Sequence, residues 1–285
     1  MTTTTSTPPG TLESPPRVPQ RVKVGSGTLV RHSGLLTARA VRTLLRQPAF
    51  AAITLVQPVI WLLLFGQLFR NVVHIPGFST ASGSYLEFIT PGVIVMTALF
   101  SSGWAGTVFI EDMDRGVMDR LLASPVRRGA MIVGTLAYQS LTTIVQTLVV
   151  FAIAFAGGAR FAGGAPGVLV TVVAACLISV IIACFSNAIA LLVRQQEALI
   201  GISQFIVLPL QFLSSSIMDT RVAPAWVRHV ARYNPVDWAS TAARAALSAD
   251  TDWGVVLPRL GLLAALAVLM AWLATRAFRT YQRSI

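Results

Sequence analysis

Runs of twenty or more mostly apolar residues recur along the chain and constrain its fold more than any other feature. The one densely charged interruption between them lies at residues 111–129. Only 12% of the 285 residues are charged, whereas about 25% are charged in an ordinary soluble domain. A helix needs about 20 apolar residues to cross the hydrocarbon core of a bilayer. The pattern therefore predicts an all-α polytopic membrane protein.

Six transmembrane helices are predicted from the apolar runs, and an even number places both termini on one side. Lys and Arg number fifteen in the segments on the N-terminal side and six on the other side. By the positive-inside rule, both termini are cytoplasmic and the cell membrane is crossed repeatedly. The same rule explains the net charge of +11 better than nucleic-acid binding does. The predicted spans are about 49–69, 87–110, 130–156, 167–193, 198–217 and 255–275.

The segment before the first span has two parts. Residues 1–28 are rich in Thr, Pro, Ser and Gly, which predicts a disordered cytoplasmic tail. Residues 29–48 alternate Leu and Val with arginines, which predicts an amphipathic helix along the membrane interface. Simple flanking charge before a span is an equal alternative. The rest of the chain, 49–283, forms the transmembrane domain.

The charged segment at 111–129 predicts a short amphipathic helix on the cytoplasmic face. Met113, Val117 and Leu121 form an apolar stripe at helical spacing. Pro125 then ends the helix, because its ring removes a backbone donor and disfavours helix in the preceding residue.

Two further features of this helix bear on what it contacts. Glu111 and Arg115 stand at i, i+4 and can form an ion pair. Gly116 costs about 1 kcal/mol relative to alanine inside a helix. It therefore indicates either a close approach by another surface or a local bend. A helix that is merely solvated beside the membrane is the alternative.

The connection at 218–254 predicts two short helices that dip into the outer membrane face. It carries Trp226 and Tyr233, aromatic residues of the kind that favour the membrane–water interface. Asn234 and Pro235 break the helical pattern between the two helices.

Polar amides inside the predicted spans are candidates for lining a pathway through the protein. Asn187 continues a face of small residues that begins at Ala175, and such faces let helices pack closely in lipid. Gln204 and Gln211 lie seven residues apart on one face, with Pro209 between them. Hydrogen bonding between helices is an equally weighted role for the two glutamines.

The sequence lacks the residue patterns that nucleotide binding, metal binding and proton coupling require. A phosphate-binding P-loop needs a lysine after glycine, and the only lysine, Lys23, lies between two valines. No metal-ligand spacing is present among the histidines, cysteines and acids, and no acid lies mid-span. We therefore predict a chain that is not an enzyme and binds no cofactor, with ATP and Mg²⁺ bound by a partner.

Three motifs, in order, carry a family resemblance over roughly residues 30–283. Glu111…Gly116…Arg120-Leu121-Leu122…Pro125 follows the second span. The sequence FLSSSIM at 212–218 ends the fifth span, and Tyr233-Asn234-Pro235 lies in the outer connection. Together they resemble the type-2 ABC exporter permeases, in particular the daunorubicin-resistance-like branch. Residues 217–221 depart from the family's pattern, which leaves the outer entrance and the substrate open.

The resemblance implies a permease half with outer re-entrant helices at Trp226, Tyr233, Asn234 and Pro235. A second permease chain, identical or related, pairs with it, and a separate ABC ATPase subunit docks beneath. The resemblance further implies export of amphiphilic drug-like or lipid substrates by alternating access. The ATPase-contacting residues would be Glu111, Gly116, Arg120, Leu121 and Pro125.

Other functions remain as alternatives. Within the same class, the substrate could be a lipid-linked glycan. An intramembrane lipid-modifying enzyme or a secondary carrier represents a different class. An ATPase reading frame next to the one that encodes this chain would favour the ABC exporter over the other classes.

Overall fold

The computed structural model describes residues 48–68, 85–117, 128–216 and 224–281, and within these ranges the chain is helical with no β-strand. The predicted tail at 1–28, nearly all of the predicted interfacial helix at 29–48, and Arg120, Leu121 and Pro125 lie outside the described residues. The helices are α2 (Pro48–Leu68), α3 (Tyr85–Gly103), α4 (Thr107–Asp114), α6 (Arg128–Ala156), α7 (Gly164–Val193), α8 (Gln196–Phe212), α9 (Ala225–Ala231), α10 (Pro235–Leu247) and α11 (Trp253–Tyr281).

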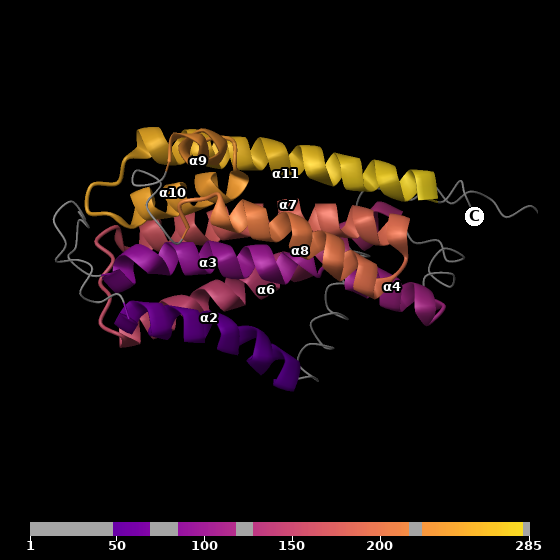
Figure 1. Ribbon diagram of the computed structural model, residues 1–285, viewed down its shortest axis with the longest axis horizontal. Helices are drawn as coiled ribbons and strands as arrows, with labels where there is room; N and C mark the ends of the chain where they lie inside the picture. Colours follow the sequence, from indigo (N-terminus) through magenta and orange to yellow (C-terminus); the bar gives the residue numbers. More distant parts are fainter. Residues whose placement is uncertain (1–47, 69–84, 118–127, 217–223, 282–285) are drawn as a thin grey trace, which may run out of the picture.

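Four helical segments of the described chain are long and apolar enough to cross a membrane: Tyr85–Asp114, Ile132–Ala156, Gly164–Val193 and Trp253–Ala277. They run side by side along the long axis of the molecule (Figure 1). A shorter apolar helix, Val56–Leu68, lies beside them. The prediction of an all-helical, multi-pass membrane protein is confirmed to this extent.

Helix α7 is the centre of the bundle and packs against α3, α6, α10 and α11 (Figure 1). Its buried face carries Ala174, Ala175, Ser179 and Ala183, all fully buried. Small side chains allow close backbone approach, which favours helix association where lipid offers no apolar drive between helices.

The second predicted span, 87–110, is not one regular helix. Helix α3 ends at Gly103 and α4 begins at Thr107, with a turn between them. Ser186 of α7 occupies this turn: its hydroxyl donates to the Gly103 carbonyl at 2.7 Å and accepts from the Gly106 amide at 3.0 Å. A Cβ at Gly106 would lie 2.5 Å from the Ser186 carbonyl oxygen, so only glycine allows this approach.

One continuous helix was predicted through residues 113, 117 and 121, but a second turn, at residues 115–116, interrupts it. Helix α4 ends at Asp114, and Gly116 adopts a left-handed φ of 62°. Glycine populates this region without strain, and of the two roles predicted for Gly116 the bend is the one observed. Met113 and Val117 therefore do not share one helix, whereas the predicted Glu111–Arg115 ion pair is present at 3.3 Å.

The contact between α7 and α10 can be tested through Gly167. A Cβ there would lie 2.4 Å from the Ala246 carbonyl oxygen, so Gly167→Ala should destabilise the fold by about 1–3 kcal/mol through overpacking. Gly201→Ala in α8 meets no atom within 4 Å and should instead stabilise by about 0.5–1 kcal/mol. Thermal unfolding in detergent measures both variants. Shifts of the same sign and size would contradict the close packing.

Candidate functional site

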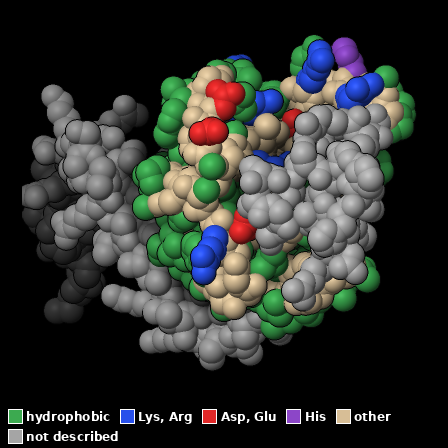
Figure 2. Space-filling model, turned by 90° about the vertical axis from the view of Figure 1, so that its left-hand side faces the viewer, with side chains coloured by type: hydrophobic (Ala, Val, Ile, Leu, Met, Phe, Trp, Pro, Cys, Tyr) green, Lys and Arg blue, Asp and Glu red, His purple; other side chains and the backbone are tan. Residues whose placement is uncertain are grey.

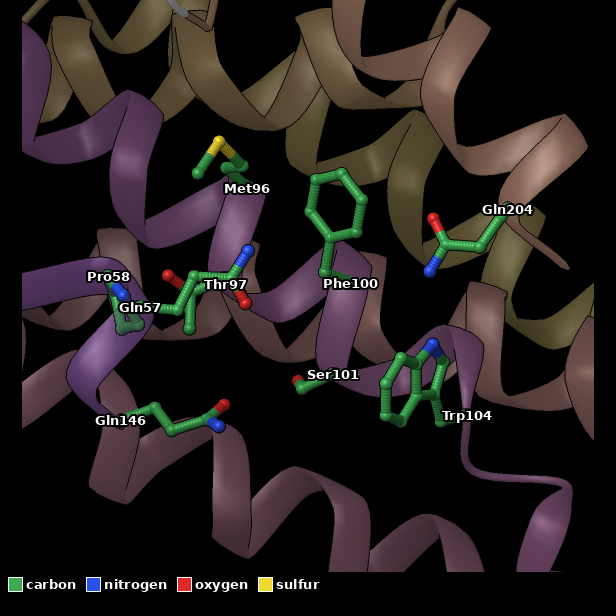
Figure 3. A pocket seen from close by; sticks show the side chains of 9 residues that line it. All are labelled: Gln57, Pro58, Met96, Thr97, Phe100, Ser101, Trp104, Gln146 and Gln204. Carbon is green, nitrogen blue, oxygen red and sulfur yellow. The ribbon is translucent and has the colours of Figure 1, made fainter. Parts of the chain in front are cut away.

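A cavity of about 270 Å³ opens between α2, α3, α6 and α8 (Figure 3). It is partly open to the surface of the apolar bundle, and six of the side chains around it are amides or hydroxyls or carry an indole N–H. We call its lining the cavity residues: Gln57, Pro58, Met96, Thr97, Phe100, Ser101, Trp104, Gln146 and Gln204.

The hydroxyl groups of the cavity already have partners, whereas the buried amide oxygen of Gln146 does not. Thr97 donates to the Val93 carbonyl at 2.8 Å, and Ser101 accepts from the Gln139 amide at 3.2 Å. Gln146 is only 4% exposed, and its amide oxygen has no hydrogen-bond partner among the residues that the structure describes. A buried acceptor without a partner is costly in a protein interior.

The aromatic side of the cavity comes from α3 and from the turn that follows it. Trp104 is the first residue of that turn and is 46% exposed, and Phe100 stands one helical turn before it. Figure 3 shows Phe100 between Met96 and Gln204, with Gln146 approaching from the other side. The turn between α3 and α4, which Ser186 stabilises, therefore also positions the Trp104 ring.

The three amides predicted to line a pathway lie in three different environments. Gln204 is a cavity residue. Gln211 is only 2% exposed, is not among the cavity residues, and both of its side-chain polar atoms are without partners in the described chain. Asn187 is buried between α7 and α6, where it donates to the Thr135 hydroxyl at 3.3 Å.

Sequence reasoning missed Gln146, although a signal for it exists. Gln139, Thr143, Gln146 and Thr147 recur at helical spacing in α6, and all four are buried. Thr143 bonds the Ser179 hydroxyl of α7 at 2.9 Å. A polar stripe on an otherwise apolar span indicates a face turned away from lipid.

At one end of the bundle, the segment Ser214–Ser216 is held by side chains from α10. The Ser215 amide donates to the Asp237 carboxylate at 2.9 Å. Arg244 donates to the carbonyls of Ser215 and Ser216, at 2.6 and 3.2 Å. Its guanidinium also lies 4.3 Å from the centre of the Phe88 ring. This segment belongs to the FLSSSIM motif, and its contacts to α10 were not foreseen.

Asn234 joins the end of α8 to the start of α10. Its side-chain oxygen caps α10 by accepting from the Val236 amide, and its nitrogen donates to the carbonyls of Leu210 and Leu213 at 2.7 and 2.8 Å. Pro235 occupies the first position of α10, where its missing N–H costs nothing.

Trp226 and Tyr233 lie at the surface on and beside α9, 63% and 72% exposed. Figure 2 shows basic and histidine side chains gathered on a lobe over α9 at this end of the molecule. The placement of Trp226 and Tyr233 at the membrane interface stays a prediction.

At the opposite end (Figure 1), α4 is anchored by a separate apolar cluster. Phe109 and Ile110 are buried against residues of α6, α7 and α8, including Ile132, Leu191 and Leu199. Glu111 and Gly116 follow directly and are the two predicted ATPase-contacting residues that the structure describes.

Comparison with known families identifies the chain. The family model for the ABC-2 type transporter matches residues 32–248. The chain belongs to the ABC-2 type transporter family. This membership confirms the resemblance drawn from the three motifs, which fall within or close to the matched range.

Similar proteins of this family include drug-resistance permeases. The chain is 25% identical over 282 residues to the daunorubicin resistance ABC transporter permease protein DrrB1 of Streptomyces coeruleorubidus, covering 96% of the chain and 98% of that protein. It is 26% identical over 233 residues to the putative transport permease ycf38 of Porphyra purpurea, covering 81% and 78%. It is 23% identical over 190 residues to the probable doxorubicin resistance ABC transporter permease protein DrrC of Mycobacterium tuberculosis, covering 67% of each.

The role of Asn234 generates a prediction. Asn234→Asp keeps an acceptor for the Val236 amide but loses the donor to the two α8 carbonyls. We expect a loss of about 2–4 kcal/mol, since each buried carbonyl left without a donor costs about 1–3 kcal/mol. The exposed neighbour change Tyr233→Phe should stay within about 0.5 kcal/mol. Equal unfolding midpoints for the two variants in detergent would contradict the claim that Asn234 stabilises the junction between α8 and α10.

Proposed function

We propose that the chain is the permease subunit of an ATP-driven exporter that moves amphiphilic drug-like or lipid substrates out of the cell by alternating access. The observation that carries this proposal is the amide- and aromatic-lined cavity between the helices of an ABC-2 type transporter. The names of two relatives, which refer to daunorubicin and doxorubicin resistance, support drug-like substrates.

We further propose six spans, with α2 and α8 as the first and fifth and both termini cytoplasmic. The distribution of basic residues supports this orientation. In this arrangement α9 and α10, which share one end of the bundle in Figure 1, are the outer re-entrant helices. Helix α4 then lies at the cytoplasmic end.

ATP hydrolysis by a separate ATPase subunit, which binds ATP and Mg²⁺, would drive transport. Its docking segment is Glu111, Gly116, Arg120, Leu121 and Pro125. The burial of Phe109 and Ile110 supports this role, because force applied to the following residues would be passed to three helices at once. A second permease chain, identical or related, completes the transporter.

The substrate pathway passes the cavity, and Gln204 is the predicted pathway residue whose position supports that role. Asn187, with its hydrogen bond to α6, and the buried Gln211 would act in the pathway only after helices move apart.

Coupling is tested by reversing one charge in the docking segment. Arg120→Glu should reduce ATP-dependent export at least about tenfold, since one lost charged contact costs about 1.5–3 kcal/mol. Uptake of a panel of neutral and cationic amphiphilic drugs and of lipid analogues into inside-out vesicles containing the ATPase is the measurement. Arg160→Glu makes the same charge change at the other end of the bundle and should export normally. Unchanged export by Arg120→Glu at equal membrane levels would contradict the assignment of the docking segment to ATPase coupling.

Partnership with an ATPase is tested by purification. The tagged chain, solubilised gently from its native membrane, should co-purify with a P-loop ATPase, and Arg120→Glu should reduce the yield of that subunit. A solubilised complex that transports substrate without any nucleotide-binding partner would refute the proposal.

A further inference from the structure

We propose that the cavity binds an uncharged amphiphile that presents a hydroxyl group to the Gln146 amide and a flat ring system to Phe100 and Trp104. This inference rests on the proposed export function and names the class of molecule that the cavity selects. The evidence is the hydrogen-bonding state of the polar groups in the cavity, together with the aromatic and uncharged side chains that line it.

Among the cavity residues, Gln146 carries the buried polar atom that lacks a hydrogen-bond partner in the described chain. Its neighbours on the buried stripe of α6 are satisfied: Thr143 bonds Ser179 at 2.9 Å, and Gln139 bonds Ser101 at 3.2 Å. Gln146 lines the cavity, is 4% exposed, and its amide oxygen has no partner among the described residues. The oxygen is itself shielded, so the amide must turn toward the cavity, where a ligand hydroxyl can donate to it.

The amides come from opposite sides of the cavity, which favours a molecule with polar groups at its rim. Figure 3 shows Gln146 on α6 and Gln204 on α8, with the Phe100 and Trp104 side chains of the α3 segment between them. Trp104 exposes 46% of its surface. Ring systems gain by stacking on such faces, and a volume of about 270 Å³ suits a compact molecule of a few fused rings.

The lining also distinguishes neutral from charged ligands. None of the nine cavity residues is charged. A cation moved into an apolar membrane interior without a counter-charge loses its hydration, and amides replace only part of it. Aromatic faces attract cations as well, so the comparison of a neutral and a cationic ligand decides which effect dominates. We expect the neutral ligand to bind more tightly.

Three anthraquinone probes, substituted at the same ring position, separate these contributions. The hydroxymethyl derivative is neutral with a donor, the methyl derivative is neutral without one, and the trimethylammoniomethyl derivative is a cation. Saturable quenching of tryptophan fluorescence is measured on the full-length chain in nanodiscs of neutral phospholipid, with protein-free nanodiscs correcting for partition. The hydroxymethyl probe should bind about tenfold more tightly than the methyl probe, which corresponds to one hydrogen bond to a buried group. The cationic probe should bind most weakly.

Gln146→Met identifies the group responsible. It should abolish the preference for the hydroxymethyl over the methyl probe, because the amide is lost while the volume is nearly kept. Ser203→Ala removes another buried polar group without a partner, outside the cavity, and should leave the preference intact. The readout is a ratio of two dissociation constants within one variant, so partial misfolding lowers the signal without changing the ratio.

Three results would overturn the inference: tightest binding by the cationic probe, a preference unchanged by Gln146→Met, or no saturable binding in the wild type. These measurements need no ATPase, so they fail separately from the export function. ATP-dependent export by a protein with an unchanged probe ratio in Gln146→Met would defeat this inference alone. A lost preference in that variant, without any ATP-dependent export by the wild type, would defeat the export function alone.

Discussion

Backbone groups released where a helix breaks inside a membrane must find partners within the protein, because no water is available there. The chain meets this constraint with side chains from distant helices. The Ser186 hydroxyl bonds both sides of the break between α3 and α4. Asn234 and Arg244 bond carbonyls at the end of α8. At these two places in the described chain, the irregular backbone is therefore bonded within the protein.

The partners for these breaks come from α7 and α10, which also contact each other closely through glycine and alanine. These two helices hold the places where the others bend. The long helices around them turn large apolar side chains outward, such as Leu257 and Val268 of α11, as lipid contact requires. The bundle therefore combines close contacts through small residues at α7 and α10 with large apolar side chains on its exterior.

The sequence predicts elements whose signals are local. The apolar runs predict where the long helices begin to within three residues, but their ends only to within seven. Asn234-Pro235 marks the start of α10 because a cap and an N1 proline are neighbours in the chain. The turn at residues 104–106 was not predicted, because its cause, Ser186, is eighty residues away. The cavity was missed for a similar reason: the polar stripe of α6 is readable, but the Trp104 ring that faces the same space is positioned by that distant contact.

The fixed break between α3 and α4 has a mechanical consequence. Asp114 lies eight residues beyond Gly106, which is about 12 Å along a helix at 1.5 Å per residue. Trp104 lies two residues on the other side of the same Ser186 contact. A tilt of α4 about this point would move its far end by several times the displacement of the indole. A small displacement at the aromatic wall of the cavity would thus accompany a larger one at the charged end of α4.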